Sequence, residues 1–241
     1  MPTTWYSAEV VDIEEMNQHV RRYFLQPEAN FPVFKPGQFI TLDLPVSDKR
    51  QQRWKSYSIA NAPQPGGLIE LCIVRHPEGS GTGYMFNEVH KGSKLVFKGP
   101  DGGFVLPQNL ENLHLVMVCT GTGVAPFRSM ISHVIEQGLP YKHIHLIFGG
   151  RKEEDILYRK EFELWRDQLP GFSYDVSLSR DPSWPGYTGY VHQIYREQYA
   201  EVKPDVVFYL CGWTRMIDEA VAHLVSEMGY APNQVRYELY G

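Results

Sequence analysis

The second half of the chain opens with Leu113-His114-Leu115-Val116-Met117-Val118-Cys119-Thr120-Gly121-Thr122-Gly123-Val124-Ala125-Pro126. The apolar run predicts a buried strand, and the glycines predict a tight turn into a helix that begins near Pro126. Glycines in such a turn let backbone N–H groups approach a pyrophosphate, which also meets the positive end of the helix. Pro126 replaces the third glycine of the usual dinucleotide fingerprint, so the turn alone also fits a plain strand-to-helix connection.

Downstream of this turn, apolar strands alternate with helical segments. The predicted strands are 113–119, 143–148, 172–178 and 206–210, and the predicted helices are 126–137, 160–169, 191–198 and 215–228. This alternation is typical of a parallel sheet that is covered by helices on both faces. We therefore predict an α/β nucleotide-binding domain over residues 113–241.

The first half has a different pattern, with short apolar runs bounded by glycine and proline. The predicted strands are 6–13, 21–25, 38–44, 57–60, 68–75 and 94–98, with one short helix at 83–89. Strands at this spacing indicate an antiparallel β-barrel or sandwich. We predict a separate β-barrel domain over residues 1–107, joined to the second domain by the polar segment 107–112.

Composition excludes several classes of function. A net charge of −5 gives no basic footprint for nucleic acid. Cys72, Cys119 and Cys211 form no CxxC pair, so we expect no metal site, disulfide or iron–sulfur cluster. No apolar run approaches the roughly 20 residues that span a bilayer, and the N-terminus lacks a signal-peptide pattern, so we expect a cytoplasmic protein.

Residues 120–129, Thr-Gly-Thr-Gly-Val-Ala-Pro-Phe-Arg-Ser, resemble the nicotinamide-nucleotide motif of the ferredoxin–NADP reductase superfamily, which has proline in place of the third glycine. Six further motifs occur in the order of that family: Tyr57-Ser58-Ile59-Ala60, Gly79-Ser80-Gly81-Thr82 with Met85, Gly99-Pro100-Asp101-Gly102-Gly103-Phe104, Phe148-Gly149-Gly150-Arg151, Gly189-Tyr190-Val191, and Cys211-Gly212 with Met216. The resemblance covers nearly the whole chain. It implies FAD bound by the first domain and NAD(P)H bound by the second.

The resemblance assigns the flavin to Tyr57, which would stack on the ring, and to Ser58, which would lie near the hydride-accepting nitrogen. It places the start of the short helix at the FAD pyrophosphate. The flavin-side residues that it implies are Tyr57, Ser58, Ile59, Cys72, Ile73, Val74, Gly81, Thr82, Gly83 and Met85.

One position departs from the family pattern. The family usually has Arg two residues before the Tyr, where this chain has Lys55, with Arg53 two residues earlier. Lys offers a point charge where Arg offers a planar fork. Either Lys55 or Arg53 is expected to bind the FAD pyrophosphate.

The resemblance also predicts the nicotinamide site. Cys211 follows a predicted strand and would lie beside the nicotinamide ring, forming a catalytic group with Ser58 and Glu238, while Tyr240 would cover the flavin. The other nucleotide-binding residues that it implies are Thr120, Gly121, Thr122, Gly123, Pro126, Gly149, Arg151, Gly212 and Met216.

The choice between NADPH and NADH rests on a few polar residues. Ser179, Arg180 and Tyr190 resemble the group that binds the 2′-phosphate in NADP-dependent members, whereas Thr188 and Asp181 are less favourable to a phosphate. We predict NADPH in preference to NADH.

Three functions follow from these features. The first is a reductase that takes hydride from NAD(P)H onto FAD and passes electrons to a separate ferredoxin- or flavodoxin-like carrier. The second is a reductase component of an oxygenase, or a reductase of free flavin or quinone. The third is a flavin-binding regulatory subunit without turnover, against which the presence of Thr122, Arg180 and Cys211 argues.

Overall fold

The computed structural model describes residues 4–28 and 30–239, and the chain forms two compact units. The first unit comprises Met1–Val105 and Ala125–Gln137, and the second comprises Leu106–Val124 and Gly138–Gly241. The predicted domain boundaries, 1–107 and 113–241, remain a prediction. The compact units differ from them at residues 125–137, which group with the first unit although they lie within the predicted second domain.

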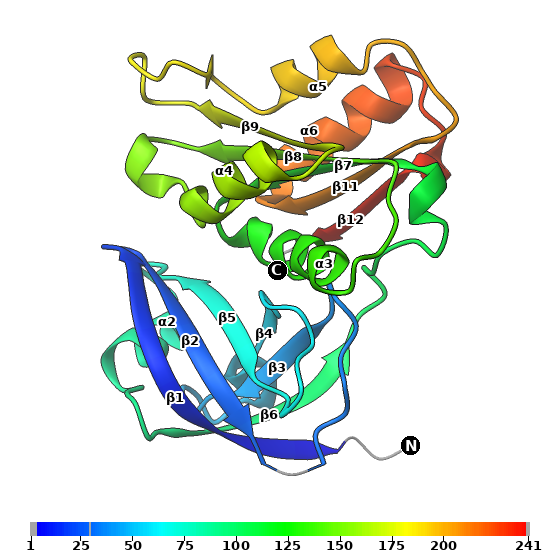
Figure 1. Ribbon diagram of the computed structural model, residues 1–241. Coiled ribbons are helices and arrows are strands. Elements are labelled where there is room, and N and C mark those ends of the chain that lie inside the picture. Colours follow the sequence, from blue (N-terminus) through cyan, green and yellow to red (C-terminus); the bar gives the residue numbers. More distant parts are fainter. Residues whose placement is uncertain (1–3, 29, 240–241) are drawn as a thin grey trace. The chain divides into compact units, whose positions relative to one another are not determined.

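The first unit contains six antiparallel strands in the order β4-β3-β6-β1-β2-β5 (Figure 1). An antiparallel bridge between Ile59 and Leu71 links the chain just after β4 to β5, so the sheet closes on itself as a barrel. The strands are β1 (Trp5–Asn17), β2 (Val20–Pro27), β3 (Phe39–Asp43), β4 (Trp54–Ser58), β5 (Ile69–Val74) and β6 (Lys94–Asp101).

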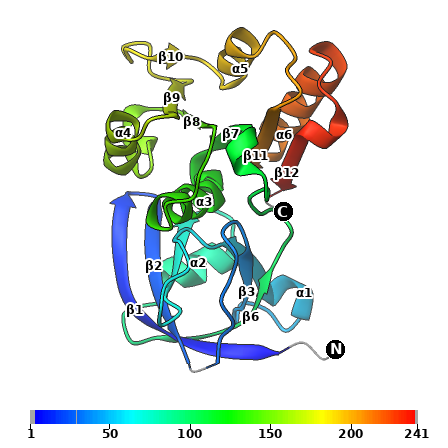
Figure 2. The same cartoon turned by 45° about the vertical axis from the view of Figure 1, so that its right-hand side comes forward.

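Alternate side chains of these strands form the barrel core. On β5, Ile69, Leu71 and Ile73 are buried in this core, as the two-residue period of a strand requires. Helix α2 (Ser80–Asn87) begins three residues before the predicted helix. Helix α1 (Arg50–Arg53; Figure 2) was not predicted, because four residues are too few to show a helical period. It leads directly into β4. Helix α3 (Ala125–Glu136) also belongs to this unit.

The second unit is built on a six-stranded parallel sheet in the order β10-β9-β8-β7-β11-β12. Chain order runs from β7 toward β8 and β9 in one direction, and from β11 to β12 in the other. The strands are β7 (His114–Thr120), β8 (His143–Gly150), β9 (Phe172–Leu178), β10 (Tyr187–Thr188), β11 (Val206–Gly212) and β12 (Val235–Leu239). The predicted fold class, a β-barrel followed by an α/β domain with a parallel sheet, is confirmed.

Helices cover both faces of this sheet. Helices α5 (His192–Gln198) and α6 (Thr214–Val221) share a hydrophobic core with β7 and β11. Helix α4 (Arg159–Gln168) covers the other face, where Phe162 packs on Tyr174 of β9 at a ring distance of 5.3 Å. The predicted helix 215–228 is α6 followed by a π-helical segment, Ala222–Glu227. Short 3₁₀ turns occur at Leu110–Asn112, Gly121–Val124, Glu153–Asp155 and Pro232–Gln234.

Over residues 4–28 and 30–239, no helix has the length and apolar character needed to cross a membrane.

Candidate nucleotide and flavin sites

The nucleotide turn lies at the point where the strand order of the second unit reverses. Strand β7 ends at Thr120, and the turn Gly121–Val124 follows at its carboxyl end, beside the end of β11. A Cβ atom on Gly123 would lie 2.4 Å from the carbonyl oxygen of Cys211. Open parallel sheets bind ligands at such switch points, so the predicted turn is at the expected edge.

The end of β11 is fixed to this turn by close backbone contact. A Cβ atom on Gly212 would lie 2.4 Å from Thr120 Oγ1, and Gly212 has a φ of +137° that favours glycine. The backbone N–H of Trp213 donates to Thr120 Oγ1 at 3.1 Å. Thr120 therefore uses its hydroxyl to join β7 to the segment after β11, a role that the glycine pattern does not reveal.

The two cysteines of this region are register partners. Cys211 of β11 lies opposite Cys119 of β7, and both side chains are fully buried. Burial raises the pKa of the Cys119 thiol, and Cys211 beside it adds to the effect. The Cys119 thiol is thus neutral and acts as a small apolar group.

Strand β12 brings Glu238 next to Cys211. The two residues are register partners on neighbouring parallel strands, so they share one face of the sheet. The last predicted strand is 206–210, so β12 was not predicted. The predicted catalytic pair Cys211 and Glu238 is brought together, whereas Ser58 belongs to the first unit. Tyr240 lies outside the described residues.

Two exposed arginines lie side by side at the carboxyl ends of β8 and β9. The backbone N–H of Arg180 donates to the carbonyl of Arg151 at 2.8 Å, and Ser179 N–H donates to Gly150 at 3.0 Å. Asp155 accepts the backbone N–H groups of Arg151 and Lys152 at 3.2 and 3.0 Å. The loop after β8 is therefore shaped by Asp155, and the guanidinium groups of Arg151 and Arg180 remain at the surface.

An exposed aromatic ring, that of Tyr190, follows a residue that is bonded to the end of β9. The Tyr190 side chain is 71% exposed, and the preceding residue is fixed because Gly189 N–H donates to Leu178 and the Gly189 carbonyl accepts from Ser177 Oγ. Asp181 is turned into its own loop, where Ser183 Oγ donates to it at 2.6 Å. This bond is the main reason why the pKa of the Asp181 carboxyl is lowered.

Gly149 completes the nucleotide edge of the sheet. A Cβ atom at this position would lie 2.7 Å from Val191 and 3.0 Å from the Thr120 methyl group. The absence of a side chain therefore lets β8 approach the turn and the loop that carries Tyr190.

On the flavin side, Lys55 lies across the start of helix α2. A Cβ atom on Gly81 would lie 2.8 Å from Lys55 Cγ and 3.0 Å from Cε. The first backbone N–H groups of a helix have no partner within it and attract anions. Because the Lys55 side chain lies along the residues that carry these N–H groups, the residues fit a pyrophosphate.

Arg53 has a different partner. Its guanidinium binds Asp43 through two hydrogen bonds, Nε to Oδ1 at 2.8 Å and Nη2 to Oδ2 at 3.0 Å. The Thr82 hydroxyl is also occupied locally, donating to Gly79 and accepting the N–H of His76 at 3.0 Å. Of the two residues proposed for the pyrophosphate, Lys55 is therefore the one placed at α2, and Thr82 presents its backbone rather than its hydroxyl.

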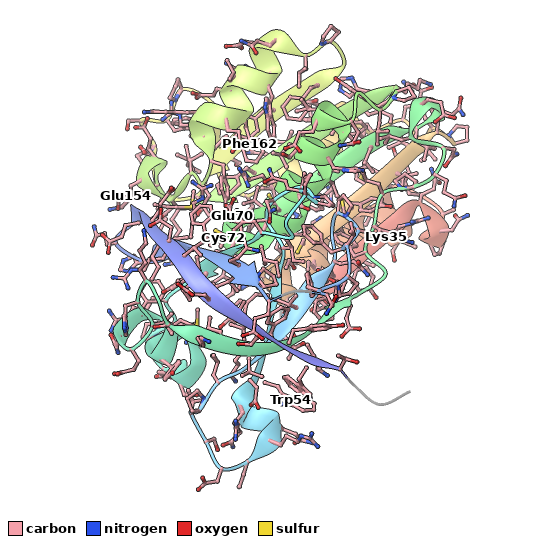
Figure 3. All side chains as sticks on the ribbon, turned by 60° about the horizontal axis from the view of Figure 1, so that its bottom comes forward. Lys35, Trp54, Glu70, Cys72, Glu154 and Phe162 are labelled. Atoms are coloured by element: carbon pink, nitrogen blue, oxygen red, sulfur yellow. The ribbon has the colours of Figure 1, made fainter. Side chains whose placement is uncertain are left out.

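The predicted flavin strands carry their residues on different faces. Tyr57 is partly buried against the barrel core, Ser58 is 4% exposed at the end of β4, and Ile59 is in the core. Burial raises the pKa of the Tyr57 phenol, which stays neutral. On β5, Ile73 faces the core, whereas Cys72 shares the opposite face with Glu70 (Figure 3).

Several other predicted site residues have buried side chains. Met85 lies in the barrel core and Met216 in the core of the second unit, so only their backbones could face a ligand. Pro126 is buried as the second residue of α3. Gly83 has open space around it, with no atom within 4 Å of an added Cβ.

A buried charge network around Glu70 was not predicted from the sequence. Glu70 is 3% exposed and binds both Arg22 and Arg128. One signal was available, since Glu70 is the only charged residue in the apolar run 68–74. A single acid within a buried strand indicates a paired charge.

Sequence profiles of two families match the chain in succession. The oxidoreductase FAD-binding domain matches residues 7–106, and the oxidoreductase NAD-binding domain matches residues 117–222. The first covers the barrel strands, and the second begins within β7 and ends after α6.

Curated relatives include ferredoxin–NADP reductase B of Sorangium cellulosum (strain So ce56), which is 32% identical over 242 residues covering 98% of this chain and 97% of that protein. The phenol hydroxylase P5 protein of Acinetobacter pittii (strain PHEA-2) is 28% identical, and the alignment covers 91% of this chain but 61% of that protein.

Solved structures share the fold. The cytochrome P450 reductase GcoB of Amycolatopsis aligns with a TM-score of 0.87 at 24% identity, covering 99% of this chain and 70% of that one. A ferredoxin NADP+ reductase of Neisseria gonorrhoeae with bound FAD and NADP aligns with a TM-score of 0.84 at 19% identity, covering both chains fully.

Proposed function

The chain belongs to the ferredoxin–NADP reductase superfamily, and we propose that it takes hydride from NADPH at a bound FAD and delivers electrons to a separate acidic carrier protein. The coarser activity is that of an FAD-dependent NAD(P)H oxidoreductase. The observation that carries the proposal is the contact of the nucleotide turn with Cys211 and Gly212 at the switch point of the sheet.

FAD, when bound, accepts a hydride and releases its electrons singly, and the protein supplies binding and orientation. Lys55 and the first N–H groups of α2 would hold the pyrophosphate. Tyr57 would offer ring surface, and Ser58 a hydroxyl at the end of β4. Cys211 and Glu238 would border the nicotinamide.

Two arginines support NADPH as the donor. Arg151 and Arg180 are linked through their backbones, so their side chains leave the sheet at one place, and guanidinium groups bind phosphate well. Tyr190 adds an exposed ring for a base. The hydrogen bonds from Ser183 turn Asp181 away from the role of ribose acceptor.

A local basic surface supports an acidic protein as the acceptor. Four of the seven residues at 49–55 are Lys or Arg and none is acidic, in a chain of net charge −5. The Arg50 guanidinium lies 4.8 Å from the Trp54 ring centre, and Lys98 Nζ lies 4.3 Å from it. Charge of this kind steers a partner of opposite sign.

The names of two relatives support a second class of electron acceptor. The phenol hydroxylase P5 protein and the electron-transfer component of toluate 1,2-dioxygenase are named for oxygenase systems, and this chain spans 61% and 67% of their lengths. An oxygenase component as acceptor, or a free flavin or quinone, is therefore the alternative. A cytoplasmic location remains part of the proposal.

Anaerobic reduction of the purified, FAD-reconstituted protein tests the proposal. We expect the flavin absorbance to bleach faster with NADPH than with NADH. Steady-state assays with ferredoxin, flavodoxin, an oxygenase component, free flavin and a quinone would then rank the acceptors. A protein that cannot be reconstituted with FAD would contradict the proposal, and faster bleaching with NADH would reassign the donor.

A further inference from the structure

Helix α3 carries the end of the nucleotide motif, yet two of its side chains bind the barrel strands. Arg128 Nη1 donates to Glu70 Oε2 at 2.9 Å and to the carbonyl oxygen of Ala60 at 2.8 Å. Ser129 Oγ donates to the carbonyl oxygen of Asn61 at 2.6 Å. The last two residues of the motif therefore hold the helix on β5 and on the segment after β4.

The carboxylate in this contact is held firmly. Glu70 is 3% exposed, and Arg22 of β2 binds both of its oxygens, Nε to Oε1 at 2.8 Å and Nη2 to Oε2 at 3.0 Å. The backbone N–H of Glu70 donates to Asn61 Oδ1 at 2.7 Å. A buried carboxylate with these partners cannot turn away without leaving a charge unpaired, so Arg128 meets a fixed acceptor.

The contact meets the barrel where the flavin residues are expected. Ala60 and Asn61 follow Ser58 directly, and Glu70 comes directly before the segment 71–74. Arg128 lies in α3, two residues beyond Pro126 and four beyond the end of the turn 121–124. One guanidinium thus connects the chain after the nucleotide turn to β5 and to the segment that follows β4, next to the residues that the family resemblance assigns to the flavin.

We propose that Arg128 and Glu70 are positioning residues for hydride transfer, an inference that rests on the proposed function. Neither residue contacts the reacting atoms. Because the turn 121–124 continues directly into α3, holding this helix on β5 and on the segment after β4 restricts the chain that binds the nucleotide. Small displacements from a reactive arrangement slow a transfer strongly while ground-state binding changes little.

Stopped-flow reduction of the FAD-loaded, full-length protein by NADPH tests the inference. We expect Arg128→Ala to lower the limiting rate by about tenfold to a hundredfold while the NADPH dissociation constant changes about twofold at most. Arg22→Ala is the matched control, because it removes a partner of the same carboxylate without touching α3, and it should keep the limiting rate. Arg128→Lys should restore part of the rate.

Hydrogen exchange of the FAD-free protein gives a readout that is independent of turnover. Peptides over 121–137 should exchange faster in Arg128→Ala than in Arg22→Ala. If Arg128→Ala does not fold, Ser129→Ala, which removes only the Asn61 contact, takes its place. Equal limiting rates in Arg128→Ala and wild type, or an equal loss in Arg22→Ala, would overturn the inference, whereas a wild-type protein that NADPH does not reduce would overturn the proposed function instead.

Discussion

Gly123 lies where the backbones of two strands leave no room for a side chain. A Cβ atom there would meet the Cys211 carbonyl oxygen at 2.4 Å and the Gly212 Cα at 2.6 Å, and both are backbone atoms that cannot rotate away. Close packing makes such overlap costly, so the second glycine of the motif has a structural reason beyond its approach to a phosphate.

Replacing Gly123 with Ala should therefore weaken both folding and nucleotide binding. We expect the free energy of unfolding to fall by about 1–3 kcal/mol, because β11 must shift to admit the methyl group. Thermal unfolding and NADPH titration would measure the two effects. Gly103→Ala is the control, since no atom lies within 4 Å of a Cβ at that glycine. Equal stability of the two variants would show that the turn yields to the methyl group.

Substitutions of Lys55 and of Arg53 should have different effects on FAD binding and on stability, although the two residues are only two positions apart. Lys55→Ala removes the charge at the start of α2 and should weaken FAD binding by about tenfold, the expected loss of one charged contact. Arg53→Ala removes the Asp43 pair and should lower the unfolding midpoint while FAD affinity is kept. Fluorescence titration of apoprotein with FAD separates them, and the reverse order would reassign the pyrophosphate to Arg53.

At the scale of elements, the sequence predicts strands and helices better than their ends. All strands of the barrel and the main alternation of the second unit follow from apolar periodicity, since that periodicity reflects burial. Strand β12 was not predicted because buried and exposed side chains do not alternate along it. Arg236, Tyr237 and Leu239 are all exposed on this edge strand. Strand β10 has two residues, too few for any pattern.

The sequence predicts the candidate site only at positions where the residue type itself indicates a chemical role. The glycine and cysteine positions follow from motif spacing. The pairing of Arg53 with Asp43, the local bonds of the Thr82 hydroxyl and the burial of Met85 depend on tertiary neighbours, which spacing does not encode. These residues show that a motif predicts where the chain meets a ligand, but not which atoms are available to it.

Three histidines gather at the opposite, amino-terminal edge of the parallel sheet. The rings of His114 and His143 are 4.2 Å apart, and the Tyr199 hydroxyl lies within hydrogen-bond distance of both His114 and His145. Burial, followed by the neighbouring histidines, lowers the pKa of His114 to about 4, and burial also lowers the pKa of His143. Strands β7 and β8 thus begin with two imidazoles, His114 and His143, whose burial favours the neutral form.

This cluster should make the second unit sensitive to acid. The unfolded His114 binds a proton below its ordinary pKa of about 6.5 and the folded one only near pH 4, so stability falls as the pH drops between these values. The loss for this partly exposed ring is on the order of 2 kcal/mol. His114→Gln should flatten that decline in urea unfolding, whereas His90→Gln, at an exposed loop, should leave it unchanged. Equal slopes in both variants would exclude the cluster as the cause.

On the scale of the whole molecule, charge is distributed unevenly. The chain carries 23 basic and 28 acidic residues, yet the charged residues of the segment 49–55 are all basic. An acidic carrier is therefore repelled by the molecule as a whole and attracted by this segment. At low ionic strength the Debye length is about 30 Å, so the carrier interacts with the net charge of the molecule as well as with this segment. At 0.15 M the Debye length is about 8 Å, so the carrier interacts mainly with the charges that it contacts.

Reversing two charges of this segment should slow electron delivery to a protein but not to a small neutral acceptor. We expect Lys49→Glu/Arg50→Glu to lower the second-order rate with an acidic ferredoxin or flavodoxin several-fold, because steering by opposite charge governs the encounter. Neither side chain belongs to the proposed FAD or nucleotide sites, so reduction of a quinone should keep its wild-type rate. Steady-state turnover with each acceptor across ionic strength would measure both.

The matched control is Lys91→Glu/Lys94→Glu, which changes the net charge by the same amount at two exposed positions of the barrel unit, in the turn before β6 and at its first residue. If the effect were one of total charge, both double variants would slow the carrier equally. A larger loss in the 49–50 variant, and a loss that shrinks as salt rises, would assign docking to the segment before β4. Equal losses, or a loss with the quinone as well, would show that this basic segment does not receive the acceptor.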